Sequence, residues 1–62
     1  LTPTERTILY HISKGKSSDE ISREMFVARK TVENHRSNIC KKLGITGNSA
    51  LLKYALRLFN EA

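Results

Sequence analysis

The sequence predicts a small all-α domain of four helices. Two capping patterns mark helix starts, and apolar residues recur at helical spacing through most of the chain. No segment alternates apolar and polar residues over the length of a strand. With 62 residues the chain has room for one small core, so residues 1–62 are expected to form a single domain. Because the sequence begins at Leu1 rather than Met, we expect this domain to belong to a longer protein.

The first helix is expected to begin at Pro3 and to stop at Gly15. Thr2 is a good N-cap, Pro3 suits the first helical position, and Glu5 completes a capping box. Gly15 is suited to the C′ position that follows a helix. The apolar residues on its buried face are Ile8, Leu9 and Ile12.

The second helix is expected to be short. Ser17 and Glu20 form a second capping box. Its apolar stripe consists of Ile21 and Met25, and the apolar pair at 26–27 interrupts the pattern and indicates a turn.

The third helix is expected over residues 29–43, and Gly44 closes it. Val32, Ile39 and Leu43 share its apolar stripe. Only about three residues separate it from the second helix, which suits a helix-turn-helix with steeply crossing elements. A plain small helical bundle remains the alternative, because its connections can be as short.

A fourth helix is expected after a turn at Gly47. Asn48 or Ser49 would cap it, and it would extend to about Asn60. Ile45 is expected to be a buried plug in the connection that precedes it.

Positive charge is concentrated in the third helix. The chain has 11 Lys and Arg against 6 Asp and Glu, a net charge of +5. Residues 1–28 are balanced, whereas residues 29–42 hold five basic residues and one acid, Glu33. A basic segment on one element is typical of a polyanion partner, although a solvated helix face is the common alternative. The five basic residues are Arg29, Lys30, Arg36, Lys41 and Lys42.

The side of the third helix opposite its apolar stripe carries polar residues suited to DNA. A helix fits the major groove, where Lys can donate to guanine, Asn can pair with adenine, and Ser can contact bases or phosphates. Glu33 and Asn38 flank this side, and a Glu can accept a hydrogen bond from cytosine N4. The residues on the outward side are Lys30, Asn34, Ser37 and Lys41.

Six short motifs follow one another at positions 1–6, 15, 17–21, 30–35, 39 and 42–45: LTPTER, G, SSDEI, KTVENH, I and KLGI. Together they resemble the LuxR-type helix-turn-helix domain, the C-terminal DNA-binding domain of NarL/FixJ-like response regulators and of quorum-sensing regulators. The resemblance runs from residue 1 to about residue 55. It implies four helices, with the third as recognition helix and the fourth as a dimer surface.

The resemblance also assigns roles to individual residues. It implies that the base-facing positions are Lys30, Glu33, Asn34 and Ser37. The expected contacts to the DNA backbone are Ser17, Ser18, Thr31, His35, Arg36, Asn38 and Lys41. For His35 the alternative is a half-buried spacer. The chain departs from the family's usual pattern at Glu33, where Lys is common, at Ala28, where a capping Ser is common, and at Thr4, where Arg is common.

The expected fourth helix carries two apolar stripes. A helix this short in so small a domain can bury only one face, so we expect the second stripe to contact a second copy of the domain. The alternative is that both stripes pack internally. The stripe expected in the core is Leu51, Tyr54, Ala55 and Leu58. The stripe expected at the dimer interface is Leu52, Leu56 and Phe59.

No pattern of catalytic or metal-binding residues is evident. There is no nucleophile elbow and no Gly-rich phosphate loop, and His11, His35 and Cys40 cannot supply a four-ligand zinc site. We therefore expect no enzyme activity, no metal and no cofactor, and we interpret Cys40 as a small apolar residue. No apolar run is long enough to cross a membrane, and a single cysteine is typical of the reducing cytoplasm.

Together these observations predict sequence-specific binding of double-stranded DNA by the output domain of a bacterial transcription regulator, with a two-component response regulator preferred. The expected partners are DNA, a second copy bound weakly through the fourth helix, and an N-terminal receiver or sensor domain of the same chain. RNA polymerase is a possible further partner. The alternatives are the promoter-reading domain of a sigma factor and a helical module whose basic helix binds an acidic protein. Salt-dependent binding to one duplex sequence would separate these hypotheses.

Overall fold

The computed structural model describes residues 1–59. These residues form four helices and no strand, so the all-α prediction is confirmed. The expected end of the last helix at Asn60 lies outside the described residues. The helices are α1 (Pro3–Ser13), α2 (Ser18–Met25), α3 (Arg29–Leu43) and α4 (Asn48–Phe59).

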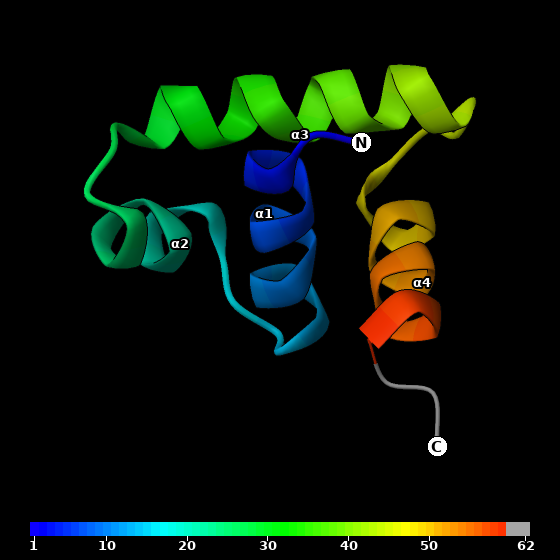
Figure 1. Cartoon of the computed structure of the whole chain (residues 1–62), viewed down its shortest axis with the longest axis horizontal. Helices are drawn as coiled ribbons and strands as arrows, with labels where there is room; N and C mark the ends of the chain where they lie inside the picture. Colours follow the sequence, from blue (N-terminus) through cyan, green and yellow to red (C-terminus); the bar gives the residue numbers. More distant parts are fainter. Residues whose placement is uncertain (60–62) are drawn as a thin grey trace.

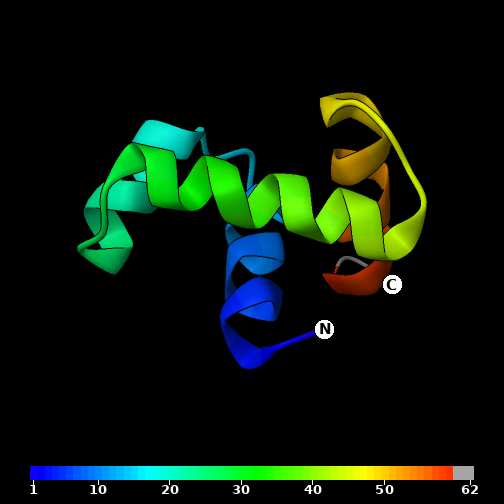
Figure 2. The same ribbon diagram turned by 90° about the horizontal axis from the view of Figure 1, so that it is seen from above.

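Helix α3 lies across the other three helices. In Figure 1 it runs along one edge of the molecule, with α2, α1 and α4 arranged beneath it in that order. The view from above shows α3 crossing over α1, with α2 near its beginning and α4 near its end (Figure 2). One side of α3 therefore packs on the domain, while its opposite side has no helix over it.

The first two helices begin as the capping residues predict. The hydroxyl of Thr2 accepts from the Glu5 amide at 3.1 Å, and the Glu5 carboxylate accepts from the Thr2 amide at 2.9 Å. Ser17 and Glu20 make the same reciprocal pair at 3.2 and 2.9 Å. Each box satisfies amide groups that a helix start leaves without partners.

The starts of the last two helices differ from the first two. Ala28 precedes α3 and supplies no side-chain cap. The predicted cap at Asn48 or Ser49 is wrong, because α4 already begins at Asn48. The carbonyl of Gly47 accepts from the Leu51 amide at 3.3 Å, so Gly47 occupies the position before the helix.

The turn between α2 and α3 contains only residues 26–28, as the short connection predicts. Phe26 ends α2 with φ 58° and ψ 43°, in the left-handed region that non-glycine residues rarely adopt. Its side chain is 92% exposed. The chain therefore turns at a strained residue whose ring makes little contact with the domain.

A small apolar core joins all four helices. Helices α1 and α3 supply the expected residues, and Ile45 and Leu43 pack against the core while half-buried. The largest fully buried side chains are Ile8, Leu9, Ile21, Val32, Ile39 and Leu51.

Two assignments in α4 need correction. Phe59, predicted to face a second copy, packs against the core and meets the ring of Tyr10 edge to face at a centroid distance of 5.5 Å. Leu58, predicted in the core, is 37% exposed. Phe59 follows Ala55 by four positions and Leu51 by eight, so these three residues share one helix face. The exposed part of the predicted second stripe is Leu52, at 39%, with Leu56 half-buried beside it.

Candidate nucleic-acid interface

The side of α3 that faces away from the domain carries the predicted polar residues. All of them are exposed, and so are Glu33 and Asn38 at the edges of this side. His35 and Thr31 are half-buried. Exposure is what contact with base edges requires, and the individual DNA contacts stay predictions. The outward residues are Lys30, Asn34, Ser37 and Lys41.

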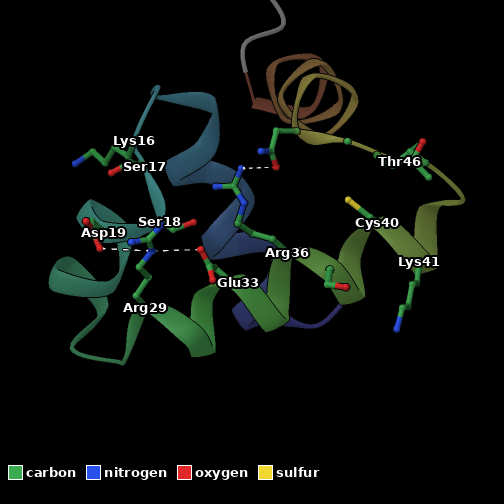
Figure 3. A pocket seen from close by; sticks show the side chains of 14 residues that line it. Lys16, Ser17, Ser18, Asp19, Arg29, Glu33, Arg36, Cys40, Lys41 and Thr46 are labelled. Carbon is green, nitrogen blue, oxygen red and sulfur yellow. Dashed lines mark hydrogen bonds and ion pairs between the residues drawn. The ribbon is translucent and has the colours of Figure 1, made fainter.

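An open groove of about 740 Å³ runs beside α3 (Figure 3). Its walls are the start of α2, one flank of α3, and residues 45–48 before and at the start of α4. It brings together site residues that lie far apart in the sequence. The predicted site residues that line it are Ser17, Ser18, Glu33, Arg36, Ser37 and Lys41.

The other predicted backbone contacts do not line the groove. Thr31, His35 and Asn38 fall on the opposite flank of α3 by helical stepping from Val32. The predicted phosphate-contacting residues are therefore divided between the two flanks of α3. A helix that lies in a major groove has one DNA strand on each side, so this division suits such a placement.

The α2 end of the groove holds a bridge of three charged residues. Arg29 Nε lies 3.2 Å from Glu33 Oε2 and 3.7 Å from Asp19 Oδ1 (Figure 3). Asp19 belongs to the first turn of α2, so the guanidinium links the two helices across the groove. At this end of the groove, Arg29 is therefore matched by two carboxylates.

Lys16 also lines this end and is paired with an acid. Its ammonium is bonded to the Glu24 carboxylate, and this bond is the main cause that lowers the pKa of Glu24. The positive charge of Lys16 is thus partly balanced within the domain.

The α4 end of the groove is basic. Arg36 Nη2 donates to Asn48 Oδ1 at 3.3 Å, as the dashed line in Figure 3 shows. Lys41 lies five residues further along α3. Asn48 is neutral, so the bond leaves the charge of Arg36 uncompensated. The charges of the groove are therefore balanced near α2, where Lys16 and Arg29 face Asp19 and Glu33, and positive near α4.

Lys42 is not available for a phosphate contact on this surface, because its Nζ lies 2.9 Å from Oε2 of Glu5 on α1. The guanidinium of Arg29 is likewise occupied by Asp19 and Glu33. Among the described residues, the basic residues of α3 that have no carboxylate within 4.0 Å are Lys30, Arg36 and Lys41.

Several residues that line the groove were not predicted as site residues, among them Lys16, Thr46 and Asn48. Asn48 carries a local signal, but that signal favours a helix cap. Thr46 carries none. The place of Thr46 and Asn48 beside α3 depends on how the connection after Gly44 brings α4 back along the domain.

The geometry agrees with the family to which the sequence is matched. The model of the family described as bacterial regulatory proteins, luxR family, matches residues 1–55. This chain belongs to the luxR family. The helix-turn-helix prediction is therefore confirmed, and the domain is of the kind that serves DNA-binding transcription regulation.

The luxR-family domain is similar to parts of three bacterial proteins of different length. "Transcriptional regulatory protein MctR" of Rhizobium johnstonii is 48% identical over 56 residues, which are 90% of this chain and 26% of that protein. "Uncharacterized response regulatory protein YgeK" of Escherichia coli is 47% identical over 58 residues, 94% of this chain and 40% of that protein. "Spore germination protein GerE" of Bacillus subtilis is 40% identical over 58 residues, 94% of this chain and 78% of that protein. The chain thus spans well under half of the first two relatives.

Three further properties of the luxR-family domain concern metal sites, membrane-spanning helices and the setting of its cysteine. Within residues 1–59 no group of three or more His, Cys, Asp or Glu side chains is placed to hold a metal ion. In the same part of the chain, no helix has the length and apolar character needed to cross a membrane. Cys40 is half-buried and packs against the core, as its interpretation as a small apolar residue predicts.

Proposed function

We propose that this luxR-family domain binds double-stranded DNA sequence-specifically, with α3 in the major groove. The observation that carries the proposal is the outward side of α3, which is polar, exposed and bordered by a groove with a basic end. An α-helix matches the width of the major groove, where each base pair presents a distinct pattern of donors and acceptors.

The outward residues have complementary roles in base recognition. Lys30 donates to guanine O6 or N7, and Asn34 makes two bonds with adenine. Ser37 contacts a base edge or a phosphate, and Glu33 accepts from an amino group at the edge of this surface. All four side chains are exposed, so the free domain need not rearrange to present them.

The two flanks of α3 contact the two DNA strands. On the groove side, Arg36 and Lys41 supply charge, and the hydroxyls at positions 17–18 supply donors at the start of α2. Thr46 and Asn48 extend this set toward α4. The opposite flank contributes Thr31, His35 and Asn38.

We place the domain at the output end of a bacterial transcription regulator, with a two-component response regulator preferred. The names of relatives support this, because one is a response regulatory protein and another a transcriptional regulatory protein. In this proposal an N-terminal receiver or sensor domain controls DNA binding in the cytoplasm, α4 joins two copies on DNA, and RNA polymerase is a further partner. The domain itself catalyses no reaction.

Selection of bound sites from a pool of random duplexes tests the proposal. We expect enrichment of one short sequence and a binding constant that falls with salt. The two basic side chains assigned to phosphates, Arg36 and Lys41, correspond to a slope of log K against log salt of about −2 for one domain. The matched control is the same pool of sites with the enriched bases scrambled.

The alternatives give other outcomes. Equal affinity for enriched and scrambled duplexes would contradict sequence-specific binding, and no measurable affinity for either duplex would favour a module that binds acidic proteins. A preference that appeared only with core RNA polymerase present would favour the promoter-reading domain of a sigma factor.

A further inference from the structure

Ion pairs join Asp19, Arg29 and Glu33 beside the outward side of α3. The middle residue, Arg29, is basic but does not itself face the bases. Arg29 is the first residue of α3 and lies on its groove flank. Its Nε donates to Glu33 Oε2 at 3.2 Å and lies 3.7 Å from Asp19 Oδ1. With two carboxylates at its guanidinium, Arg29 is poorly placed to act as a phosphate contact.

The bridge does little for stability. All three side chains are about half exposed or more, and exposed ion pairs contribute little to the free energy of unfolding. Its main effect is geometric, because a side chain held by a neighbour one helical turn away samples fewer conformations. Glu33 is the residue whose orientation is restricted.

The restricted carboxylate has one oxygen left to accept a bond. Arg29 engages Oε2, and within residues 1–59 no hydrogen bond engages Oε1. Glu33 lies at the border between the groove and the outward side of α3, next to Asn34. Its position therefore suits contact with a base edge rather than with a phosphate.

The charge of Glu33 would by itself oppose this contact. A carboxylate brought to DNA is repelled by the phosphates, and the effect is strong where water is displaced. The guanidinium of Arg29, which is always protonated and is also shared with Asp19, offsets part of that charge. Arg29 thereby orients Glu33 and also lowers the electrostatic cost of placing it in the groove.

We infer that Arg29 is a positioning residue that presents Glu33 Oε1 to the N4 amino group of a cytosine, with Asp19 anchoring Arg29 from α2. The inference rests on the proposed function. Cytosine is the base of choice because its major-groove edge offers a donor alone. Adenine places the N7 acceptor beside its amino group, and guanine and thymine present acceptors, all of which repel a carboxylate.

The test measures base preference at a single position. We start from a duplex that carries the selected site and replace each base pair in turn by the other three. The affinity of every duplex is then measured for the wild-type domain and for the variants. Glu33→Gln locates the contact, because a Gln prefers adenine and should move the preference from cytosine to adenine at one position only. Glu33→Ala should abolish the preference at that position.

The decisive variant is Arg29→Met, which keeps length and removes charge. We expect wild type to favour cytosine at the located position by about tenfold, within the range for one mismatched base pair. Arg29→Met should reduce this to about twofold or less, and adding it to Glu33→Ala should change nothing further. The matched control is Arg23→Met, an exposed Arg on α2 that does not line the groove and should leave the preference unchanged.

Two outcomes would overturn the inference while leaving the proposed function intact. One is a cytosine preference that survives Arg29→Met but not Glu33→Ala, since Glu33 would then act without Arg29. The other is that the wild-type domain binds one site specifically, and Glu33→Ala has the same base preference as wild type at every position of that site. If wild type selected no sequence at all, the proposed function itself would fail. Circular dichroism of Arg29→Met checks that the fold is retained.

Discussion

Lys42 on α3 binds both carboxylate oxygens of Glu5 on α1, with its Nζ 2.9 Å from each. The Glu5 side chain is only 5% exposed, whereas that of Lys42 is half exposed. The bond from Lys42 and the backbone bond from Thr2 lower the pKa of Glu5 from about 4.5 to about 2. One buried carboxylate thus caps α1 and fixes α3 across it.

This pair predicts a loss of stability in acid. Glu5 is ionised more readily in the folded state than in the unfolded state, so its contribution is complete above pH 4.5 and is lost as the pH falls toward 2. Glu5→Gln should lower the melting temperature at pH 7, and the difference from wild type should shrink steadily below pH 4.5. Thermal unfolding followed by circular dichroism between pH 2 and 7 measures this. A difference that stays constant over that range would contradict the role of the ionised carboxylate.

Phe26 predicts a variant that is more stable than wild type. Its backbone is left-handed, which costs an L-residue about 1–2 kcal/mol, and its 92% exposed ring recovers little by packing. Asn tolerates this conformation better. Phe26→Asn should therefore raise the free energy of unfolding by about 0.5–1 kcal/mol, equivalent to roughly 2–8 °C in a domain of this size.

The control for this prediction is Phe26→Ala, which removes the ring but keeps a residue unsuited to the left-handed region. It should leave the melting temperature nearly unchanged. A loss of stability in both variants would mean that the ring of Phe26 packs in solution.

Most of the fold could be predicted because its signals are local. Thr2 with Glu5, and Ser17 with Glu20, fix two helix starts within four residues each. Gly44 ends α3 with φ 68°, a conformation that glycine adopts without strain. These residues need no knowledge of the remainder of the chain.

The features that could not be predicted depend on contacts between helices. Both stripes of α4 have helical spacing, and the contact of Phe59 with Tyr10 of α1 places Phe59 against the core, apart from the rest of its predicted stripe. The bridge from Asp19 to Arg29 joins residues ten positions apart on different helices. For the candidate site, the outward face of α3 follows from periodicity, whereas the groove beside it exists only once α2 and α4 are in place.

Asn34 provides the most direct check of base recognition. Its side chain is exposed on the outward side of α3, so Asn34→Ala should leave the fold intact. The variant should lose about 1–3 kcal/mol of binding free energy at the selected site and discriminate less at one base pair. Titrations with the selected and a scrambled duplex measure both effects. An equal loss on both duplexes would identify Asn34 as a general contact instead.

Glu33→Lys should strengthen non-specific binding. The substitution changes the local charge by two, and it also removes one of the two acids that hold Arg29. The slope of log K against log salt on scrambled duplex should steepen by about 1 to 2, since each additional phosphate contact contributes about 0.9. Glu33→Gln, which changes the charge by one, should give a smaller effect in the same direction. An unchanged slope in both variants would place Glu33 away from the DNA.

The last prediction concerns pairing of two domains through α4. Leu52 is 39% exposed on one edge of this helix, with the half-buried Leu56 one turn further along. Phe59 packs on Tyr10, so the apolar surface that remains is smaller than the sequence predicts. A patch this small falls below the usual size of a stable interface, and the domain should be monomeric at micromolar concentration.

DNA should change this balance. Two half-sites spaced by a helical turn would hold two domains at high effective concentration, so binding to a double site should be cooperative even though free domains do not associate. Leu52→Asp should abolish the cooperativity, because it places an unpaired carboxylate in the shared patch, and should preserve affinity for a single half-site. Leu58→Asp is the matched control: Leu58 is 37% exposed on the opposite edge of α4, so the same change there should leave cooperativity intact. Titration of one-site and two-site duplexes separates the cases. Equal loss of cooperativity in both variants would point to a general effect of charge on α4, and unfolding of Leu52→Asp would assign Leu52 to the core; either result would contradict pairing through the Leu52 edge.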